Sequence, residues 1–270
     1  MSKAWRDKII GVIHLGAMPG DPLYTGGGFE GVRDAALRDL DALLEGGVDG
    51  CIIENFGSAP FAKGDASSRL PAHQVALMAM LTRELREKMG DEPLLGVNCL
   101  RNDAHSAMGI AAVAGADFIR VNVHTGAYLT DQGVIEGEAH ETLRYRSALG
   151  ASEQVDIWAD VLVKHATPLA PTDPVTATKD CLLRGLASAV IVTGTGTGEP
   201  ISTALLETVR EAAGGRPVVL GSGVTPERAP QLWPLADVAI VGTYFKENGD
   251  VRAPVELARV ERLVKALRDN

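Results

Sequence analysis

Short apolar runs alternate with longer segments of helical spacing along the whole chain. Eight runs of five to eight residues are rich in Val and Ile, a length that favours strands over helices. Between them, the leucines at 37–44 and the apolar residues at 75–89 recur every three or four positions, as on the buried face of a helix. The predicted strands are Ile9–Leu15, Val48–Asn55, Leu94–Leu100, Asp117–His124, Ile157–Lys164, Ala189–Thr193, Pro217–Gly221 and Asp237–Gly242.

This alternation predicts parallel strands joined by crossover helices. Eight strand–helix units in 270 residues match one closed (β/α)8 TIM barrel of the ribulose-phosphate-binding type better than an open doubly wound sheet. Closure also explains why no predicted strand has the polar character of a sheet edge. Since no linker or low-complexity segment divides the chain, we expect a single domain over residues 1–270.

The composition excludes several kinds of partner. A net charge of −9 without a long basic run argues against nucleic acid or an anionic membrane surface. No stretch approaches the roughly 18 apolar residues of an integral membrane segment. The start of the chain lacks the apolar region of a signal peptide, and three scattered cysteines form no disulfide framework. We therefore expect a cytoplasmic protein, and a homo-oligomer because barrels often associate through their outer helices.

The loops after the last two predicted strands have the features of a phosphate site. Gly221 and Gly223 allow close backbone approach to a ligand, and Thr225 is expected to cap a helix that starts at Pro226. Gly-Thr at the eighth strand end completes the cup, where barrels often hold phosphate. We predict a phosphorylated small-molecule ligand, unless these glycines only form tight turns. The predicted phosphate-binding residues are Gly196, Gly221, Ser222, Gly223, Gly242 and Thr243.

The sixth strand runs into a segment, 193–198, in which threonine and glycine strictly alternate. This differs from the GxGxxG dinucleotide fingerprint. The segment either wraps the sugar or phosphate of the ligand, with Thr193 and Gly194 binding substrate, or is a flexible loop without contact.

Polar residues lie at the carboxyl ends of the first five predicted strands, where an apolar interior would be ordinary. Period-two alternation places them on the inward faces. Glu54 or Asp160 serves as general base, or the two form an acid/base pair. Lys164 forms a Schiff base or stabilises developing negative charge. The predicted catalytic residues are Glu54, Asp160, Lys164, His14 and His124, with Asn98 and Asn122 orienting sugar hydroxyls.

Structural roles stay open for several of these residues. Asp160 and Lys164 could be part of a buried ion pair that ties the fifth strand to a neighbour. Glu54 could pair with Arg120, whose deeper position favours a structural role. The sequence requires no cofactor. A divalent metal held by Glu54, Asp160 and the histidines is an alternative, although no dense ligand motif such as HExxH exists.

Three loops at strand carboxyl ends are longer than turns require, which suggests a lid or a substrate wall. They span Gly16–Glu30, Phe56–Pro71 and Thr125–Gly137.

Several unusual strings then occur in the order found in a known family. The chain resembles the BtpA/SgcQ family over roughly residues 8–267, through segments 10–20, 49–55, 120–126, 160–165 and 193–196. The resemblance implies a phosphate-binding barrel. Cyanobacterial members are linked to photosystem I biogenesis, and others are labelled nucleosidases or lie near sugar-phosphate metabolism. No catalytic residue is transferred from the family.

The leading hypothesis is an enzyme that acts on a phosphorylated sugar or nucleotide, with N-glycosidic hydrolysis first among its reactions. A sugar-phosphate isomerase or epimerase, or a Schiff-base lyase using Lys164, is the alternative chemistry. Two non-catalytic alternatives remain: a photosystem or membrane-complex biogenesis factor, and a module that binds a phosphorylated metabolite.

Overall fold

Eight parallel strands form a closed barrel in the computed structural model, which describes residues 5–194, 196 and 200–269. Each predicted run overlaps one strand of the barrel, so the predicted fold is confirmed. The first strand pairs with the last as well as with the second, which closes the sheet. Around the barrel the strands are β1 (Lys8–His14), β2 (Gly50–Glu54), β3 (Leu94–Asn98), β4 (Phe118–Val121), β7 (Asp156–Val161), β9 (Ala189–Val192), β10 (Val218–Leu220) and β11 (Val238–Val241).

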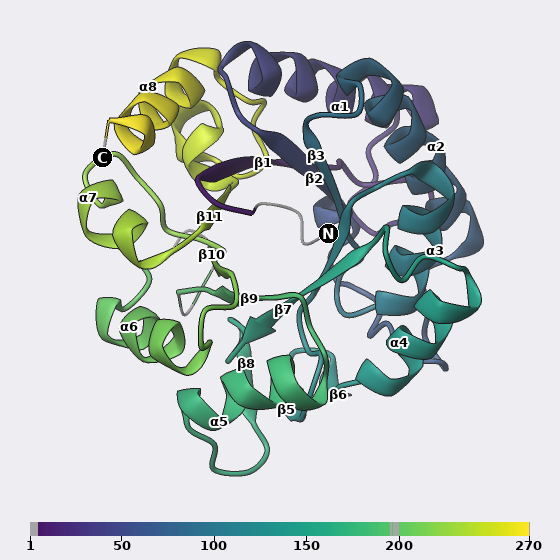
Figure 1. The fold of residues 1–270 in the computed structure, drawn as a ribbon. Coiled ribbons are helices and arrows are strands. Elements are labelled where there is room, and N and C mark those ends of the chain that lie inside the picture. The colour runs from purple at the N-terminus through teal and green to yellow at the C-terminus, as the bar shows by residue number, and fades with distance from the viewer. Residues whose placement is uncertain (1–4, 195, 197–199, 270) are drawn as a thin grey trace.

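Helices surround the barrel as an outer ring, and the purple first helix lies beside the yellow last one (Figure 1). None of the helices in the described ranges is both long enough and apolar enough to cross a membrane. The α-helices are α1 (Gly28–Glu45), α2 (Ala72–Met89), α3 (Ala104–Ala114), α4 (Ala139–Ala148), α5 (Pro174–Lys179), α6 (Thr203–Ala212), α7 (Ala229–Leu232) and α8 (Leu257–Arg268); a π-helical turn, η2 (Asp180–Arg184), follows α5.

Aromatic rings fill the interior of the barrel. Trp158 stacks on Phe118 with ring centroids 3.8 Å apart, and Trp5 meets the same indole edge-on at 5.1 Å. Both Trp158 and Phe118 are fully buried among aliphatic residues of the other strands. Such close packing leaves no room for a ligand there, so a binding site has to lie at the strand ends.

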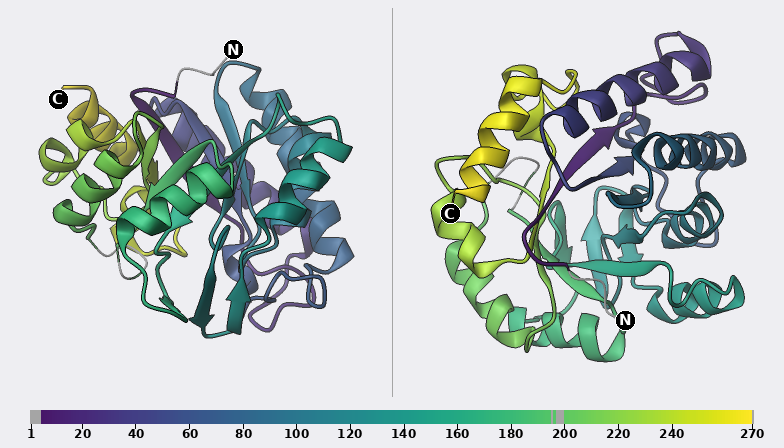
Figure 2. Two further views of the ribbon diagram at one scale, coloured as in Figure 1. Left: turned by 60° about the horizontal axis from the view of Figure 1, so that its bottom comes forward. Right: turned by 45° about the horizontal axis from the view of Figure 1, so that its top comes forward.

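A small antiparallel sheet was missed by the sequence analysis, which treated 125–137 as a loop. The strands β5 (Ala127–Thr130) and β6 (Gly133–Glu136) form a hairpin, and β8 (Ala166–Pro168) pairs with β5. These strands follow β4 and β7, so they extend the barrel at its carboxyl end. The left view of Figure 2 shows these teal strands at the lower end of the molecule.

A buried ion pair fixes the last strand–helix connection. Lys246 is 1% exposed, and its Nζ lies 2.5 Å from Asp39 Oδ2 on α1. The other carboxylate oxygen of Asp39 accepts a hydrogen bond from the Val255 backbone at 2.9 Å. The segment after β11 is thereby held against the first helix, next to the predicted phosphate loop.

Candidate active site

Two adjoining pockets lie at the carboxyl ends of the barrel strands. The first has a volume of about 200 Å³ and lies over the loops after β10 and β11. The second has a volume of about 390 Å³ and lies over β2, β3, β4 and β7. Glu54, Arg120 and Lys164 line both pockets, so the two form one mouth with these side chains at the junction.

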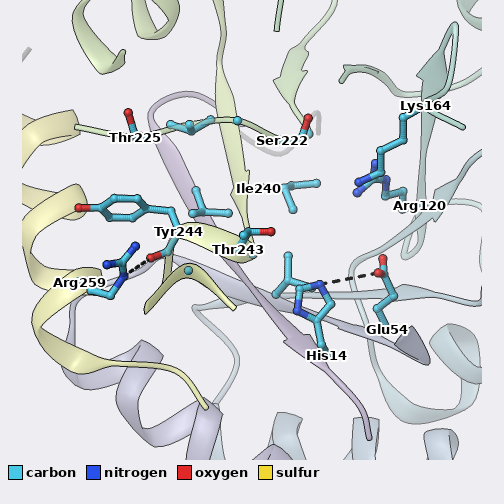
Figure 3. Close-up of a pocket in the computed structure, with 17 residues that line it drawn as sticks. His14, Glu54, Arg120, Lys164, Ser222, Thr225, Ile240, Thr243, Tyr244 and Arg259 are labelled. Carbon is cyan, nitrogen blue, oxygen red and sulfur yellow. Dashed lines mark hydrogen bonds and ion pairs between the residues drawn. The ribbon is translucent and has the colours of Figure 1, made fainter. Parts of the chain in front are cut away.

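The first pocket contains the predicted phosphate loops, and we call it the cup. Its lining includes Gly221, Ser222, Gly223, Gly242 and Thr243, all of which the sequence analysis placed there. In Figure 3 the hydroxyl groups of the cup lie on one side, and Glu54, Arg120 and Lys164 lie on the other. A phosphate in the cup would therefore hold the rest of a ligand toward the junction.

The backbone of the cup requires small residues. Gly223 has a φ of 63°, in the left-handed region that favours glycine. At Gly242, an added Cβ would lie 2.7 Å from Cε1 of His14. Close packing of His14 on this glycine connects the cup to the acid–base groups.

The predicted helix start beside the cup is wrong. Helix α7 begins at Ala229, and Thr225 instead starts a turn whose carbonyl accepts from the Arg228 and Ala229 amides at 3.1 and 2.9 Å. Pro226 lies in that turn. Thr225 still lines the cup, so the site depends on the loop itself and not on a helix that begins at Pro226.

Arg259 and Tyr244 also line the cup, and sequence reasoning missed both. Arg259 comes from the first turn of α8; its Nε donates to the Tyr244 carbonyl at 2.6 Å, and its guanidinium lies 4.6 Å from the Tyr244 ring centroid. Both are labelled in Figure 3. The arginine gives the cup a positive charge in a protein whose net charge is −9.

The loop after β9 contacts one of the loops that form the cup. The Gly194 amide donates to Ser222 Oγ at 2.9 Å, which joins the loops after β9 and β10. Thr193 is 4% exposed, and its buried hydroxyl has no hydrogen-bond partner among the described residues. Neither residue lines the two pockets as described, and neither does Gly196. Thr195, Thr197 and Gly198 of the alternating segment lie outside the described residues.

Glu54 is a buried carboxylate with one firm partner. Asn98 Nδ2 donates to its Oε2 at 2.5 Å, while its Oε1 lies 3.8 Å from His14 Nε2 (Figure 3). Burial lowers the pKa of His14 well below 6.5, and the cations Lys246, Lys164 and Arg120 lower it further. His14 is therefore a neutral imidazole at pH 7, and its Nδ1 has no partner among the described residues.

Asp160 is held in a buried ion pair, and this geometry does not favour the role of general base that was predicted for it. Arg120 donates to both carboxylate oxygens, from Nε at 3.2 Å and from Nη2 at 3.0 Å. Asn122 Nδ2 donates to the same carboxylate at 2.5 Å. The side chain of Asp160 is fully buried, and the residue lines neither pocket. The structural alternative, a buried ion pair that ties this strand to a neighbour, is present for Asp160, and its partner is Arg120 on β4.

Lys164 reaches the junction by an unexpected backbone path. Strand β7 ends at Val161, and Leu162 has a φ of 50°, so the predicted alternation stops before the lysine. Burial lowers the pKa of Lys164 to about 8; Arg120 and Arg101 lower it too, against Glu54 and Asp160. An amine with this pKa can give or take a proton near neutral pH.

His124 does not join the cluster, contrary to the prediction. Strand β4 ends at Val121, and the chain turns so that His124 Nε2 bonds the Gly185 carbonyl at 2.8 Å, next to η2. Burial lowers its pKa. The residue lines a separate surface pocket with Thr125 and Arg144. Its geometry is that of a structural histidine.

The second pocket combines aromatic rings with cations, and we call it the side chamber. Phe56 and Phe61, with centroids 6.5 Å apart, come from the predicted long loop after β2. Arg101, which follows β3, lines the chamber as well, and so do Asn98 and Asn122. The long loop at 125–137 contributes Asp131, whereas loop 16–30 contributes no lining residue and instead supports its neighbour through Asp21, which accepts from Ser58 Oγ at 2.8 Å.

The predicted metal ligands do not come together. Within the described ranges, no three His, Cys, Asp or Glu side chains are placed to hold one ion. Two of the proposed ligands have other partners: Asp160 accepts hydrogen bonds from Arg120, and His124 bonds the Gly185 carbonyl away from the junction. The described geometry therefore does not assemble the metal site considered from the sequence.

Comparison of the chain with known proteins identifies its family. The BtpA family model matches residues 5–269. The chain belongs to the BtpA family. It is 43% identical over 259 residues to the photosystem I biogenesis protein BtpA of Synechocystis sp., covering 96% of this chain and 87% of that one. It is 44% identical over 257 residues to an uncharacterized Pyrococcus furiosus protein, covering 95% and 93%.

Solved structures share the fold of this BtpA family member. A KDPGal structure aligns with a TM-score of 0.55 at 15% identity, covering 97% of this chain and 92% of that one. Phosphoribosyl anthranilate isomerase from Thermus thermophilus aligns with a TM-score of 0.54 at 16% identity, covering 97% and 98%. At these identities the likeness establishes the barrel fold alone.

Proposed function

We propose that this BtpA family member hydrolyses the N-glycosidic bond of a phosphorylated sugar derivative or nucleotide. One observation carries the proposal: the cup and the side chamber meet at Glu54, Arg120 and Lys164. A phosphate anchored in the cup directs the sugar to the junction. The group attached to the anomeric carbon then enters the side chamber, whose lining includes Phe56 and Phe61 and suits an aromatic base.

The acid and the base of this reaction are assigned by environment. Glu54 takes a proton from water, and the oxygen of that water bonds to the anomeric carbon. The carbon–nitrogen bond breaks, and the ammonium of Lys164 donates its proton to the departing nitrogen. With a pKa of about 8, Lys164 is protonated at pH 7 and is a better acid than an ordinary lysine. Arg120 is held by Asp160 and supplies a fixed positive charge beside the reacting groups.

Lys164 also supports a second candidate, a Schiff-base lyase. A lysine whose pKa is lowered toward neutrality forms an imine with a carbonyl substrate more readily. An assembly role, which the name of the Synechocystis relative suggests, is a third candidate and needs no acid–base pair.

The test measures, by chromatography, how much free base the protein releases from phosphorylated N-ribosides. The same compounds without the phosphate group are the comparison. We expect cleavage of phosphorylated substrates, and losses of about 10²–10⁴-fold in Glu54→Gln and Lys164→Met. The matched controls are Glu87→Gln and Lys88→Met, which make the same substitutions at two exposed positions on α2. Borohydride trapping of substrate on Lys164 would instead favour the lyase. If Glu54→Gln and Lys164→Met both kept the protein's full function in the cell, the assembly role would be favoured.

A further inference from the structure

The side chamber carries a surplus of positive charge that hydrolysis alone does not explain. Its lining contains Arg101, Arg120, Arg252 and Lys164, together with His165. Among the residues that the structure describes, two carboxylates line it, Glu54 and Asp131. Arg120 already has a carboxylate partner in Asp160. The positive charge of Arg101 and Arg252 remains to be accounted for.

Arg101 is the decisive residue because it is buried without being fully bonded. The residue is 4% exposed, and its Nη2 donates to the Lys164 carbonyl at 2.7 Å. Its Nε is buried and has no hydrogen-bond partner among the described residues. An unbonded donor on a buried charged group is costly, and a ligand oxygen would remove that cost.

The two carboxylates of the chamber do not meet this need. Asp131 is exposed at the β5–β6 turn, so water screens its charge. Glu54 is already bonded to Asn98, and the proposed reaction requires it as the base at the junction. A carboxylate brought in by the ligand would complement the arginine better than either, because a guanidinium binds two carboxylate oxygens at once.

We propose that the group held in the side chamber is an aromatic ring bearing a carboxylate, with the ring against Phe56 and Phe61 and the carboxylate on Arg101. The inference rests on the proposed function, since it names the leaving group of the N-glycosidic substrate as an acidic heteroaromatic base. Arg252, exposed at the chamber rim, adds positive charge that attracts such an anion.

The experiment compares two probes of nearly the same size and shape, the anion pyridine-3-carboxylate and the neutral pyridine-3-carboxamide, by calorimetric titration of the intact protein. We expect the carboxylate to bind at least about tenfold more tightly, which is the effect of one charge-assisted hydrogen bond. Arg101→Met should abolish this preference and leave the affinity for inorganic phosphate unchanged. Arg184→Met, whose side chain is 82% exposed, is the control and should behave as wild type.

Arg101→Lys is the second variant, needed in case Arg101→Met does not fold. It keeps the positive charge but not the paired donors of the guanidinium, so it should retain a reduced preference for the carboxylate probe. The proposal is overturned if neither probe binds, if the amide binds as tightly as the acid, or if folded Arg101→Met keeps the preference. Failure of the proposed function is separate: carboxylate preference without base release would refute hydrolysis alone. Release of neutral bases without carboxylate preference would refute this inference alone.

Discussion

Arg120 on β4 grips Asp160 on β7 with two hydrogen bonds, of 3.2 and 3.0 Å, in the interior of the barrel. Burial opposes the charge on Arg120, yet Asp160 and Glu54 raise its pKa above the ordinary value of an arginine. The pair fixes the guanidinium between the cup and the side chamber. Asp160 is bonded in this pair and lines neither pocket, whereas the carboxylate of Glu54 lines both.

Breaking this pair should cost stability. We expect Asp160→Ala to lower the free energy of unfolding by about 3–5 kcal/mol, because Arg120 would remain buried and charged without its partner. Urea denaturation measures the change. The double variant Arg120→Met/Asp160→Leu should lose much less than the sum of the two single variants. Additive losses would contradict the view that the two residues act as a unit.

The pH dependence of the proposed reaction follows from Lys164. Since its pKa is about 8 and the protonated form is the acid, kcat should fall about tenfold per pH unit above that value. Lys164→Arg stays protonated, so the alkaline decline should move to higher pH while the maximal rate falls. An unchanged alkaline decline in Lys164→Arg would show that another group donates the proton.

Arg259 should act on phosphate binding. Arg259→Met removes a positive charge from the α8 side of the cup lining and the hydrogen bond to the Tyr244 carbonyl. KM for a phosphorylated substrate should therefore rise about 10–100-fold, with a smaller change in kcat. The comparison is Arg262→Met, one turn further along α8, whose side chain is 65% exposed and pairs with Glu227. Equal effects of the two variants would argue against a specific contact.

Two buried histidines should make the protein less stable in acid. The pKa values of His14 and His124 are both lowered from 6.5, chiefly by burial. The unfolded chain therefore binds protons that the folded chain does not between 6.5 and the lowered values. The free energy of unfolding should decrease as pH falls through this window, by up to about 1.4 kcal/mol per pH unit for each histidine. Urea titrations of His14→Asn and His124→Asn should show a shallower dependence, and an unchanged slope would refute the assignment.

The sequence was sufficient for the barrel because its signal is repeated. Each buried parallel strand is a short run of β-branched residues, and each is followed by a helix, so single errors do not change the fold. The small sheet was missed because β8 has only three residues, 166–168, and pairs with β5 across an interval that no local pattern encodes. Pairing of distant short strands is decided by tertiary contacts.

The site shows where period-two reasoning stops. It placed Glu54 and Asn122 correctly because both lie at or just beyond strand ends. It failed for His124, three residues past the end of β4, because alternation does not continue outside a strand. Arg101 directly follows the third predicted run and could have been found by the same position rule. Arg259 could not, because nothing local in a helix shows which turn faces a loop 15 residues upstream.

The most direct test of the account is phosphate binding at the cup. Ribose 5-phosphate should raise the melting temperature of the wild-type protein where ribose does not; ligand at about 100 times its Kd adds roughly 2.7 kcal/mol of stability. Gly223→Asp, which puts a carboxylate into the cup, should abolish the shift. Gly215→Asp, at φ 88° in open space on the opposite side of the barrel, bears similar backbone strain and should keep it. A shift that survives in Gly223→Asp, or no shift in the wild type, would contradict the phosphate site.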